Sequence, residues 1–315
     1  MSSGVKGLKF VSIVVVIFSL LTTCKDSKTK NGSDKDIENK NIVDVISNGM
    51  DFQLPKKIKS GWTTFRYINN SAEVQFFILE KMPDTIRIND YKRDVIPPFM
   101  DAFDQFDKGD FEAGMKEFGK IPAWFSQVEL AGGVGLTSPK QISQSTFFLI
   151  PGVYILNCYV RMPSGRPHTL MGMIEELVVE EDKNEQRRPK PDLEISVSSE
   201  NGVSFVDSLK AGNYTLSVDF KDQKLYESML GHDINLVKLE YPGLLEILGS
   251  WINSGDLRAF RTPAPAGMIF LGGVEDLTAA TQGYFEVSLD PGNYVLISEV
   301  PKAIERKMFY EFKVY

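Results

Sequence analysis

The chain has 315 residues, of which 43% are hydrophobic and 24% are charged, and its formal net charge is −7 at pH 7. This length and hydrophobic content suit a folded protein of two domains rather than a disordered chain. The acidic charge argues against nucleic acid as a partner. With only 2 histidines in the chain, few catalytic arrangements that depend on imidazole are open to it.

The N-terminus has the pattern of a secretory signal peptide. Lysines precede the apolar stretch 10–21, which is too short for a membrane-spanning helix because such a helix needs about 20 apolar residues. Leu21-Thr22-Thr23-Cys24 follows and resembles the lipobox of Gram-negative lipoproteins, with Thr where Ala, Gly or Ser is usual. We predict a signal peptide at 1–23 and lipidation of Cys24. The alternative is an ordinary secretory signal followed by an incidental cysteine.

The next segment, 24–44, is rich in Lys, Asp, Ser and Asn. It cannot bury enough apolar surface to offset the entropy lost on ordering, so we predict a lipidated flexible tether. The lipobox resemblance implies attachment to the membrane through Cys24 in the bacterial cell envelope, at the outer membrane, on its periplasmic or its surface face. Lipidation would leave Cys158 without a disulfide partner in the chain.

Two segments of the chain resemble each other. Residues 132–160 and 272–300 align without a gap at an offset of 140 positions, and both contain Gly-Gly-Val and Pro-Gly-x-Tyr. This pattern indicates a diverged tandem duplication. We predict one domain at 45–180 and another at 192–315, joined by the charged, proline-containing linker 181–191.

Short segments rich in aromatic and β-branched residues predict strands in both domains. The Pro151-Gly152 and Pro291-Gly292 pairs favour type II turns. Tyr154 and Tyr294, which follow these pairs, resemble the tyrosine corner of Greek-key sandwiches. The predicted strands are 62–68, 75–80, 146–150 and 153–160 in the first domain, and 214–219, 234–239, 284–289 and 293–300 in the second.

A helical insertion is predicted at 83–127, where apolar residues recur at helical spacing with breaks at Pro97-Pro98 and near Gly109. A shorter helix is predicted after Pro242-Gly243 in the second domain. Aspartates recur every third position on the insertion, which predicts a solvated helix face rather than a calcium loop, since such a loop needs ligands at alternate positions. These are Asp101, Asp104, Asp107 and Asp110.

The strongest chemical pattern follows the last strand of the first domain. Cys158 is followed by Pro167-His168 and then by Gly172-Met173. This order resembles the copper-binding loop of cupredoxins, in which a thiolate, an imidazole and a weak thioether join one upstream histidine. The resemblance covers both predicted domains. It implies an all-β fold of tandem Greek-key, cupredoxin-like β-sandwiches, each with a helical insertion, and a copper site for electron transfer.

The ligand set is incomplete in both domains. Family members have a histidine just before an apolar strand, but residues 73–76 of this chain are Glu-Val-Gln-Phe. The second domain has His232 at that place, with Ser298 at the cysteine position. Two interpretations follow: a copper-free sandwich with no cofactor, or a Cu(I) site formed by Cys158, His168 and Met173. His232 is a remote further ligand, available if the two domains pack face to face.

Our leading functional prediction is a lipid-anchored binding or interaction protein of the cell envelope, non-catalytic, with an unidentified envelope protein or ligand as its partner. Neither histidine lies in a nucleophile context, and the sequence contains no phosphate-binding glycine motif and no zinc-type spacing. The alternative is a copper protein for electron transfer or copper handling that uses Cys158, His168 and Met173.

Overall fold

The computed structural model describes residues 41–315. The predicted signal peptide, the predicted lipidation site Cys24 and most of the predicted tether lie outside the described residues. Strand β1 (Ile42–Ser47) buries Val43 and Val45, so residues 42–44, which were assigned to the predicted tether, belong to a strand. Among the described residues, no helix has the length and apolar content needed to cross a membrane.

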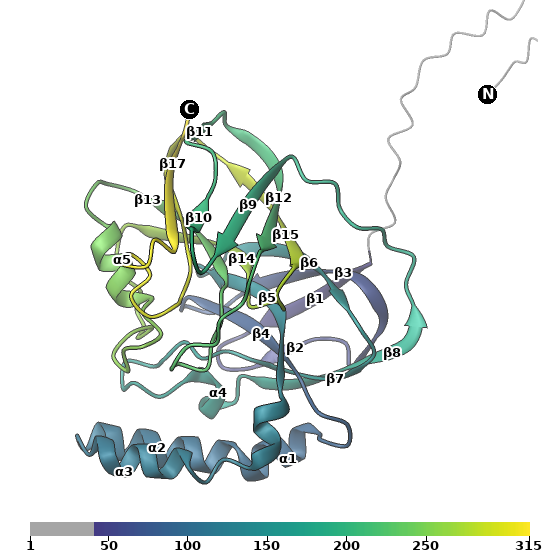
Figure 1. Ribbon diagram of the computed structural model, residues 1–315, viewed down its shortest axis with the longest axis vertical. Coiled ribbons are helices and arrows are strands. Elements are labelled where there is room, and N and C mark those ends of the chain that lie inside the picture. Colours follow the sequence, from purple (N-terminus) through teal and green to yellow (C-terminus); the bar gives the residue numbers. More distant parts are fainter. Residues whose placement is uncertain (1–40) are drawn as a thin grey trace, which may run out of the picture. The chain divides into compact units, whose positions relative to one another are not determined.

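Strands dominate both halves of the described chain (Figure 1). The N-terminal half, residues 41–183, contains β1, β2 (Phe52–Gln53), β3 (Lys57–Asn69), β4 (Gln75–Lys81), β5 (Glu129–Thr137), β6 (Ile142–Leu149), β7 (Gly152–Asn157) and β8 (Ile174–Lys183). The C-terminal half, residues 193–315, contains β9 (Leu193–Ser198), β10 (Gly202–Ser204), β11 (Ser208–Leu209), β12 (Gly212–Phe220), β13 (Ile234–Leu239), β14 (Met268–Val274), β15 (Thr281–Leu289), β16 (Gly292–Ile297) and β17 (Phe309–Val314).

The strands form two sheets, and each sheet runs through both halves. The first has the order β2-β1-β3-β6-β15-β12-β9-β10. The second has the order β8-β7-β4-β5-β14-β13-β16-β17-β11. Each half repeats the same pairings, including the parallel pair β1–β3 in one half and β9–β12 in the other. The all-β, Greek-key sandwich prediction is confirmed by this strand order.

The two halves meet along a seam of paired strands. Across β5 and β14, Val134 pairs with Val274, and across β6 and β15, Ser145 pairs with Phe285. Each pair is separated by the 140 positions of the sequence offset. Equivalent residues therefore face one another across the seam, so an approximate two-fold axis relates the two halves there.

The Gly-Gly-Val sequences lie in β5 and β14, and their second glycines allow close backbone packing. A Cβ atom added to Gly133 would lie 2.1 Å from the carbonyl oxygen of Phe77, and one added to Gly273 would lie 1.8 Å from that of Ile234. Neither distance is compatible with a side chain. The motif is therefore explained by contact with the adjacent strand rather than by a turn.

Strand β3 belongs to both sheets. Its first residues pair with β8, and its later residues pair with β6. The change occurs at Gly61, whose φ of +113° is rarely adopted by residues with a side chain. Since β8 pairs with β3 as far as Lys183, residues 181–183 form strand rather than the predicted linker.

The turns that follow β6 and β15 differ in part from the prediction. Gly152 has φ +154°, whereas the glycine of a type II turn needs about +80°, so the Pro-Gly pair forms a bend from which β7 begins. The tyrosine-corner contacts are present in both halves. The hydroxyl of Tyr154 donates to the Ile150 carbonyl at 2.8 Å, and that of Tyr294 donates to the Asp290 carbonyl at 2.8 Å.

The insertion between β4 and β5 consists of α1 (Ile88–Asp94), α2 (Ile96–Asp107), α3 (Phe111–Phe118) and the 3₁₀ helix η1 (Ala123–Gln127). As predicted, the helices break at Pro97-Pro98, which lie in the first turn of α2, and at Gly109. Asp101, Asp107 and Asp110 of the predicted solvated face are exposed; Asp104 pairs with Arg166, and Asp110 caps α3. Elsewhere, α4 (His168–Met171) follows β7, and α5 (Leu245–Trp251) lies where a helix was predicted.

One hydrophobic core contains residues of both halves, so the apolar interior is continuous across the seam. A second, smaller cluster joins the insertion to the sheet, where Tyr91 and Val95 of the helices meet Ile155 and Ile174 of the strands. The helices therefore form a separate layer on the outside of the sandwich (Figure 1).

Candidate metal centres

The strand register relates positions of the two halves to each other. Ile78 pairs with Asn157 across β4 and β7, and Asn235 pairs with Ile297 across β13 and β16. Since Asn157 and Ile297 are related by the repeat offset, Ile78 corresponds to Asn235. The same register relates Gln75 to His232, Phe76 to Asp233, Cys158 to Ser298, and Tyr159 to Glu299.

Two of the predicted copper ligands lie together in the N-terminal half. Cys158 directly follows β7, and His168 begins α4, with 3.7 Å between Sγ and Nδ1. The loop between them is closed by backbone hydrogen bonds, in which the His168 amide donates to the Val160 carbonyl at 2.7 Å and the Thr169 amide donates to the Cys158 carbonyl at 2.8 Å. The backbone therefore fixes the separation of thiol and imidazole.

Burial keeps both groups neutral. Cys158 and His168 have no exposed surface. Desolvation raises the pKa of the Cys158 thiol to about 12 and lowers the pKa of the His168 imidazole to about 4, because a buried site disfavours the charged form of each. Within the described residues, the Nε2 atom of His168 has no hydrogen-bond partner.

The third predicted ligand, Met173, is fully buried in the main core. At the position of the missing upstream histidine, the Gln75 amide is already engaged: its Nε2 donates to the Gly49 carbonyl at 2.7 Å. A four-ligand blue-copper set does not fit these residues. A soft ion of low coordination fits the Cys158 and His168 pair.

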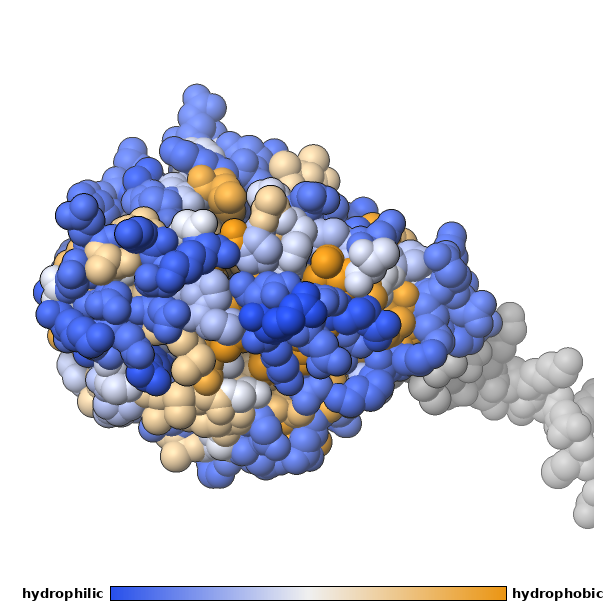
Figure 2. Space-filling model, turned by 90° about the horizontal axis from the view of Figure 1, so that it is seen from below, coloured by the Kyte–Doolittle hydropathy of each residue, from blue (hydrophilic) through white to orange (hydrophobic). Residues whose placement is uncertain are grey.

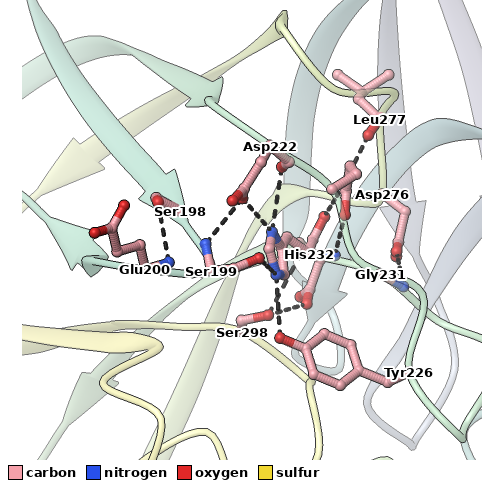
Figure 3. A network of polar contacts seen from close by, with 12 residues as sticks. Ser198, Ser199, Glu200, Asp222, Tyr226, Gly231, His232, Asp276, Leu277 and Ser298 are labelled. Carbon is pink, nitrogen blue, oxygen red and sulfur yellow. Dashed lines mark hydrogen bonds and ion pairs between the residues drawn. The ribbon is translucent and has the colours of Figure 1, made fainter.

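The remote candidate His232 lies in a network of the C-terminal half (Figure 3). Its Nδ1 lies 3.3 Å from the Asp222 carbonyl oxygen and 3.5 Å from a carboxylate oxygen of the same residue. Its Nε2 lies 3.2 Å from the Tyr226 hydroxyl and 3.5 Å from the Ser199 hydroxyl. Burial lowers the pKa of this imidazole. These partners all belong to its own half, so the structure does not bring His232 to Cys158.

Sequence reasoning missed a second cluster, in which carboxylates gather at the ends of three neighbouring strands. Asp233 precedes β13, Glu275 follows β14, and Glu299 lies two residues beyond β16. One oxygen from each of the three lies within 4.8 Å of the others. Exposed fractions are 1%, 0% and 1%, and Asp276, beside them in sequence, is 2% exposed.

Two of these carboxylates are held by hydrogen bonds. Asp233 Oδ1 accepts from the Ser298 hydroxyl and from the Glu299 amide, each at 2.7 Å. The Asn235 side-chain amide donates to Asp233 at 2.8 Å and to Glu299 at 3.1 Å. The other oxygen of Glu299 accepts from the Tyr159 hydroxyl, which belongs to the N-terminal half. The cluster therefore lies at the seam.

The carboxylate of Glu275 differs from the other two. Both of its oxygens are buried, and neither has a hydrogen-bond partner within the described residues. Burial, with repulsion from Glu299, Asp233 and Asp276, holds the pKa of this carboxyl well above its usual range. Across residues 41–315, no ion pair involves any of the four acids.

The repeat alignment contained the signal for this cluster. It places Glu275 opposite Gly135, Asp276 opposite Leu136, and Glu299 opposite Tyr159, so acids replace small, apolar or aromatic residues at strand ends. A polar residue after a strand usually indicates a loop, and only the register of three strands brings these acids together.

The arrangement of two Greek-key sandwiches with a parallel first pair defines the class of fold as all-β and cupredoxin-like. No protein-family model and no curated protein matches the chain. Solved structures similar to it include auracyanin A, a "blue" copper protein from Chloroflexus aurantiacus, at 19% identity over 44% of this chain and 98% of that one, with a TM-score of 0.27. A multicopper oxidase matches at 12% identity over 87% and 88% of the two chains, with a TM-score of 0.23. A copper-containing nitrite reductase from Thermus scotoductus matches at 13% identity over 87% of this chain and 61% of that one, with a TM-score of 0.22.

Proposed function

We propose that this chain is a non-catalytic binding protein of the bacterial cell envelope, anchored through lipidated Cys24, and that its helical insertion is the surface that binds a protein partner. The observation that carries the proposal is the exposure of large apolar side chains on that insertion. Phe111 is 60% exposed and Met115 is 61% exposed, one turn apart on α3. Met100 on α2 is 37% exposed.

The insertion supports such a role because its other face is firmly attached to the sandwich. Arg87 forms an ion pair with Glu176 of β8, and Arg166 forms one with Asp104 of α2. Phe99 and Phe118 pack between the helices, with ring centroids 5.0 Å apart. The exposed residues therefore lie on a supported platform, which reduces the entropy lost when a partner binds.

The charged residues around the exposed apolar side chains indicate what kind of surface the partner would present. Apolar side chains are interspersed with hydrophilic ones on the face that carries the insertion (Figure 2). Asp101, Asp107 and Glu112 are acidic and exposed near the apolar positions. A partner with an apolar pocket bordered by lysine or arginine would complement this surface, since opposite charges at the rim favour association.

The proposal is tested by photo-crosslinking in intact cells. A photoreactive residue is placed at Phe111 or Met115, with Phe148 of β6, which is 51% exposed, as the matched control outside the insertion. We expect one discrete adduct from both insertion positions and none from the control. Absence of an adduct at both positions, or the same adduct from all three, would contradict the proposal.

The second candidate function is binding of Cu(I), favoured by the 3.7 Å between Cys158 Sγ and His168 Nδ1. Two ligands at about 2.3 Å and 2.0 Å from one ion, at a tetrahedral angle, lie about 3.5 Å apart. Cys158 and His168 would hold the ion, with Met173 as the thioether, and a bound copper would supply a one-electron redox couple. The chain's own contribution is a dry, prearranged donor pair.

Copper binding is tested by loading the purified chain with Cu(I) or Cu(II) and removing excess metal. Retained copper is measured by mass spectrometry, and thiolate-to-copper charge transfer is sought in the visible spectrum. We expect one Cu(I) per chain, and none in the H168L variant. A wild-type chain that retains no copper in either state would end this candidate.

A further inference from the structure

We propose that the three buried carboxylates of Asp233, Glu275 and Glu299 form a binding site for one hard divalent cation, best matched by Ca²⁺, at the seam between the two halves. One oxygen of each lies within 4.8 Å of the others. This is a different site from the Cys158 and His168 pair, with different donor chemistry.

The unpartnered carboxylate of Glu275 points to a ligand rather than to a purely structural cluster. A buried carboxylate is costly unless hydrogen-bond donors or a cation compensate its charge. Neither oxygen of Glu275 has a hydrogen-bond partner within the described residues, so no donor there compensates this carboxylate. A cation bound by all three side chains would satisfy Glu275 and offset the repulsion among them.

The neighbouring groups position the other two carboxylates for such a role. Asn235 donates to both Asp233 and Glu299, and its own Oδ1 accepts from the Leu136 amide at 2.6 Å. Each of these carboxylates keeps free lone pairs after its hydrogen bonds, since an ionised carboxylate can accept about four. The two are therefore fixed in orientation without being saturated.

The donor set selects the class of cation. All three side chains offer oxygen, which suits Ca²⁺, Mg²⁺ and Mn²⁺ rather than the softer copper ions. Ca²⁺ binds oxygens at 2.3–2.6 Å, so ligands on opposite sides lie about 5 Å apart, whereas Mg²⁺ needs a smaller octahedron and retains several waters. The acids, each 0–1% exposed, leave little place for a hydrated ion. Ca²⁺ is thus the best match.

Bound there, the cation would join the two halves. The Tyr159 hydroxyl of the N-terminal half donates to Glu299, and the Gly132 amide donates to the Asp276 carbonyl at 2.6 Å. Both contacts cross the seam beside the acids. We therefore expect the ion to stabilise the pairing of β5 with β14 and to raise the melting temperature of the whole chain.

Binding is measured on the full-length chain, purified in detergent and stripped with EDTA, by calorimetric titration with CaCl₂, MgCl₂ or MnCl₂. We expect one Ca²⁺ site, with weaker binding of Mg²⁺. E275Q should weaken Ca²⁺ binding by about tenfold or more, which corresponds to about 1.4 kcal/mol. The matched control E246Q, at an exposed position of α5, should bind as the wild type does.

The location of the ion is tested with Tb³⁺, which replaces Ca²⁺ and luminesces when a nearby aromatic ring transfers energy to it. The Tyr159 hydroxyl donates to Glu299, so its ring lies close enough to transfer energy to the ion, and Y159F measured at saturating Tb³⁺ should lose most of the sensitised emission.

Three results would overturn the proposal: a wild-type chain that binds none of the three ions, an E275Q variant that binds Ca²⁺ as tightly as the wild type, or Tb³⁺ emission unchanged in Y159F. The first does not depend on the folding of any variant.

Discussion

Three corresponding positions, at the ends of two neighbouring strands, carry opposite chemistry in the two halves. In the N-terminal half, Phe76 packs against the ring of Tyr159 with centroids 4.5 Å apart, and Cys158 lies beside them. In the C-terminal half, the corresponding positions are Asp233, Glu299 and Ser298, joined by hydrogen bonds. The strand register sets where these side chains meet, whereas the residue types determine whether the place is an apolar contact, a soft donor pair or an acidic site.

The largest effect on stability is expected at the apolar contact of the N-terminal half. Phe76 has no exposed surface, so Phe76→Ala should lower the free energy of unfolding by about 3–5 kcal/mol through the lost burial and the cavity left behind. Urea denaturation measures this, with F148A at an exposed position as control. A loss in Phe76→Ala as small as that in F148A would show that this buried contact does not stabilise the strand ends.

A pH effect is expected at Glu80, beneath the insertion. Burial raises the pKa of this carboxyl to about 7 from an ordinary 4.5, so the folded chain binds the proton more tightly than the unfolded chain. Stability is therefore lost as pH rises from about 4.5 through about 7. Relative to the wild type, E80Q should gain about 2 kcal/mol between about pH 5 and pH 8. Parallel pH profiles of stability for the two proteins would show that Glu80 does not titrate this way.

Cys158→Ser gives the N-terminal half a serine at the position that corresponds to Ser298 of the C-terminal half. A hydroxyl in this dry position should cost about 1–2 kcal/mol of unfolding free energy, and the variant should lose Cu(I) retention while keeping Ca²⁺ binding. Thermal denaturation and metal analysis of the same samples test both expectations. Retention of copper without the thiol would remove Cys158 from the soft donor pair.

The smallest effects are expected where the halves are alike. Tyr154→Phe and Tyr294→Phe each remove one tyrosine-corner hydrogen bond of 2.8 Å, and each should cost about 1 kcal/mol. Chemical denaturation of the two variants should give equal losses. A loss confined to one of them would mean that the corners do not contribute equally.

Much of the fold follows from local sequence. The bounds predicted for β13, 234–239, match the structure, because β-branched and apolar residues there lie between turn residues. Strands β5 and β14 were not predicted, since their glycines resemble turn residues until the adjacent backbone is known. Cys158 and His168 could be expected to meet because a short loop joins them. The meeting of Asp233, Glu275 and Glu299 depends on long-range register, which local patterns do not reveal.

The central claim is that corresponding strand ends hold different ligands, and native mass spectrometry of the Ca²⁺-loaded chain tests it most directly. We predict the mass of one Ca²⁺ on the wild-type chain and on C158S, and its loss in E275Q. A wild-type chain without bound Ca²⁺, or a C158S variant that loses the ion together with E275Q, would contradict the account.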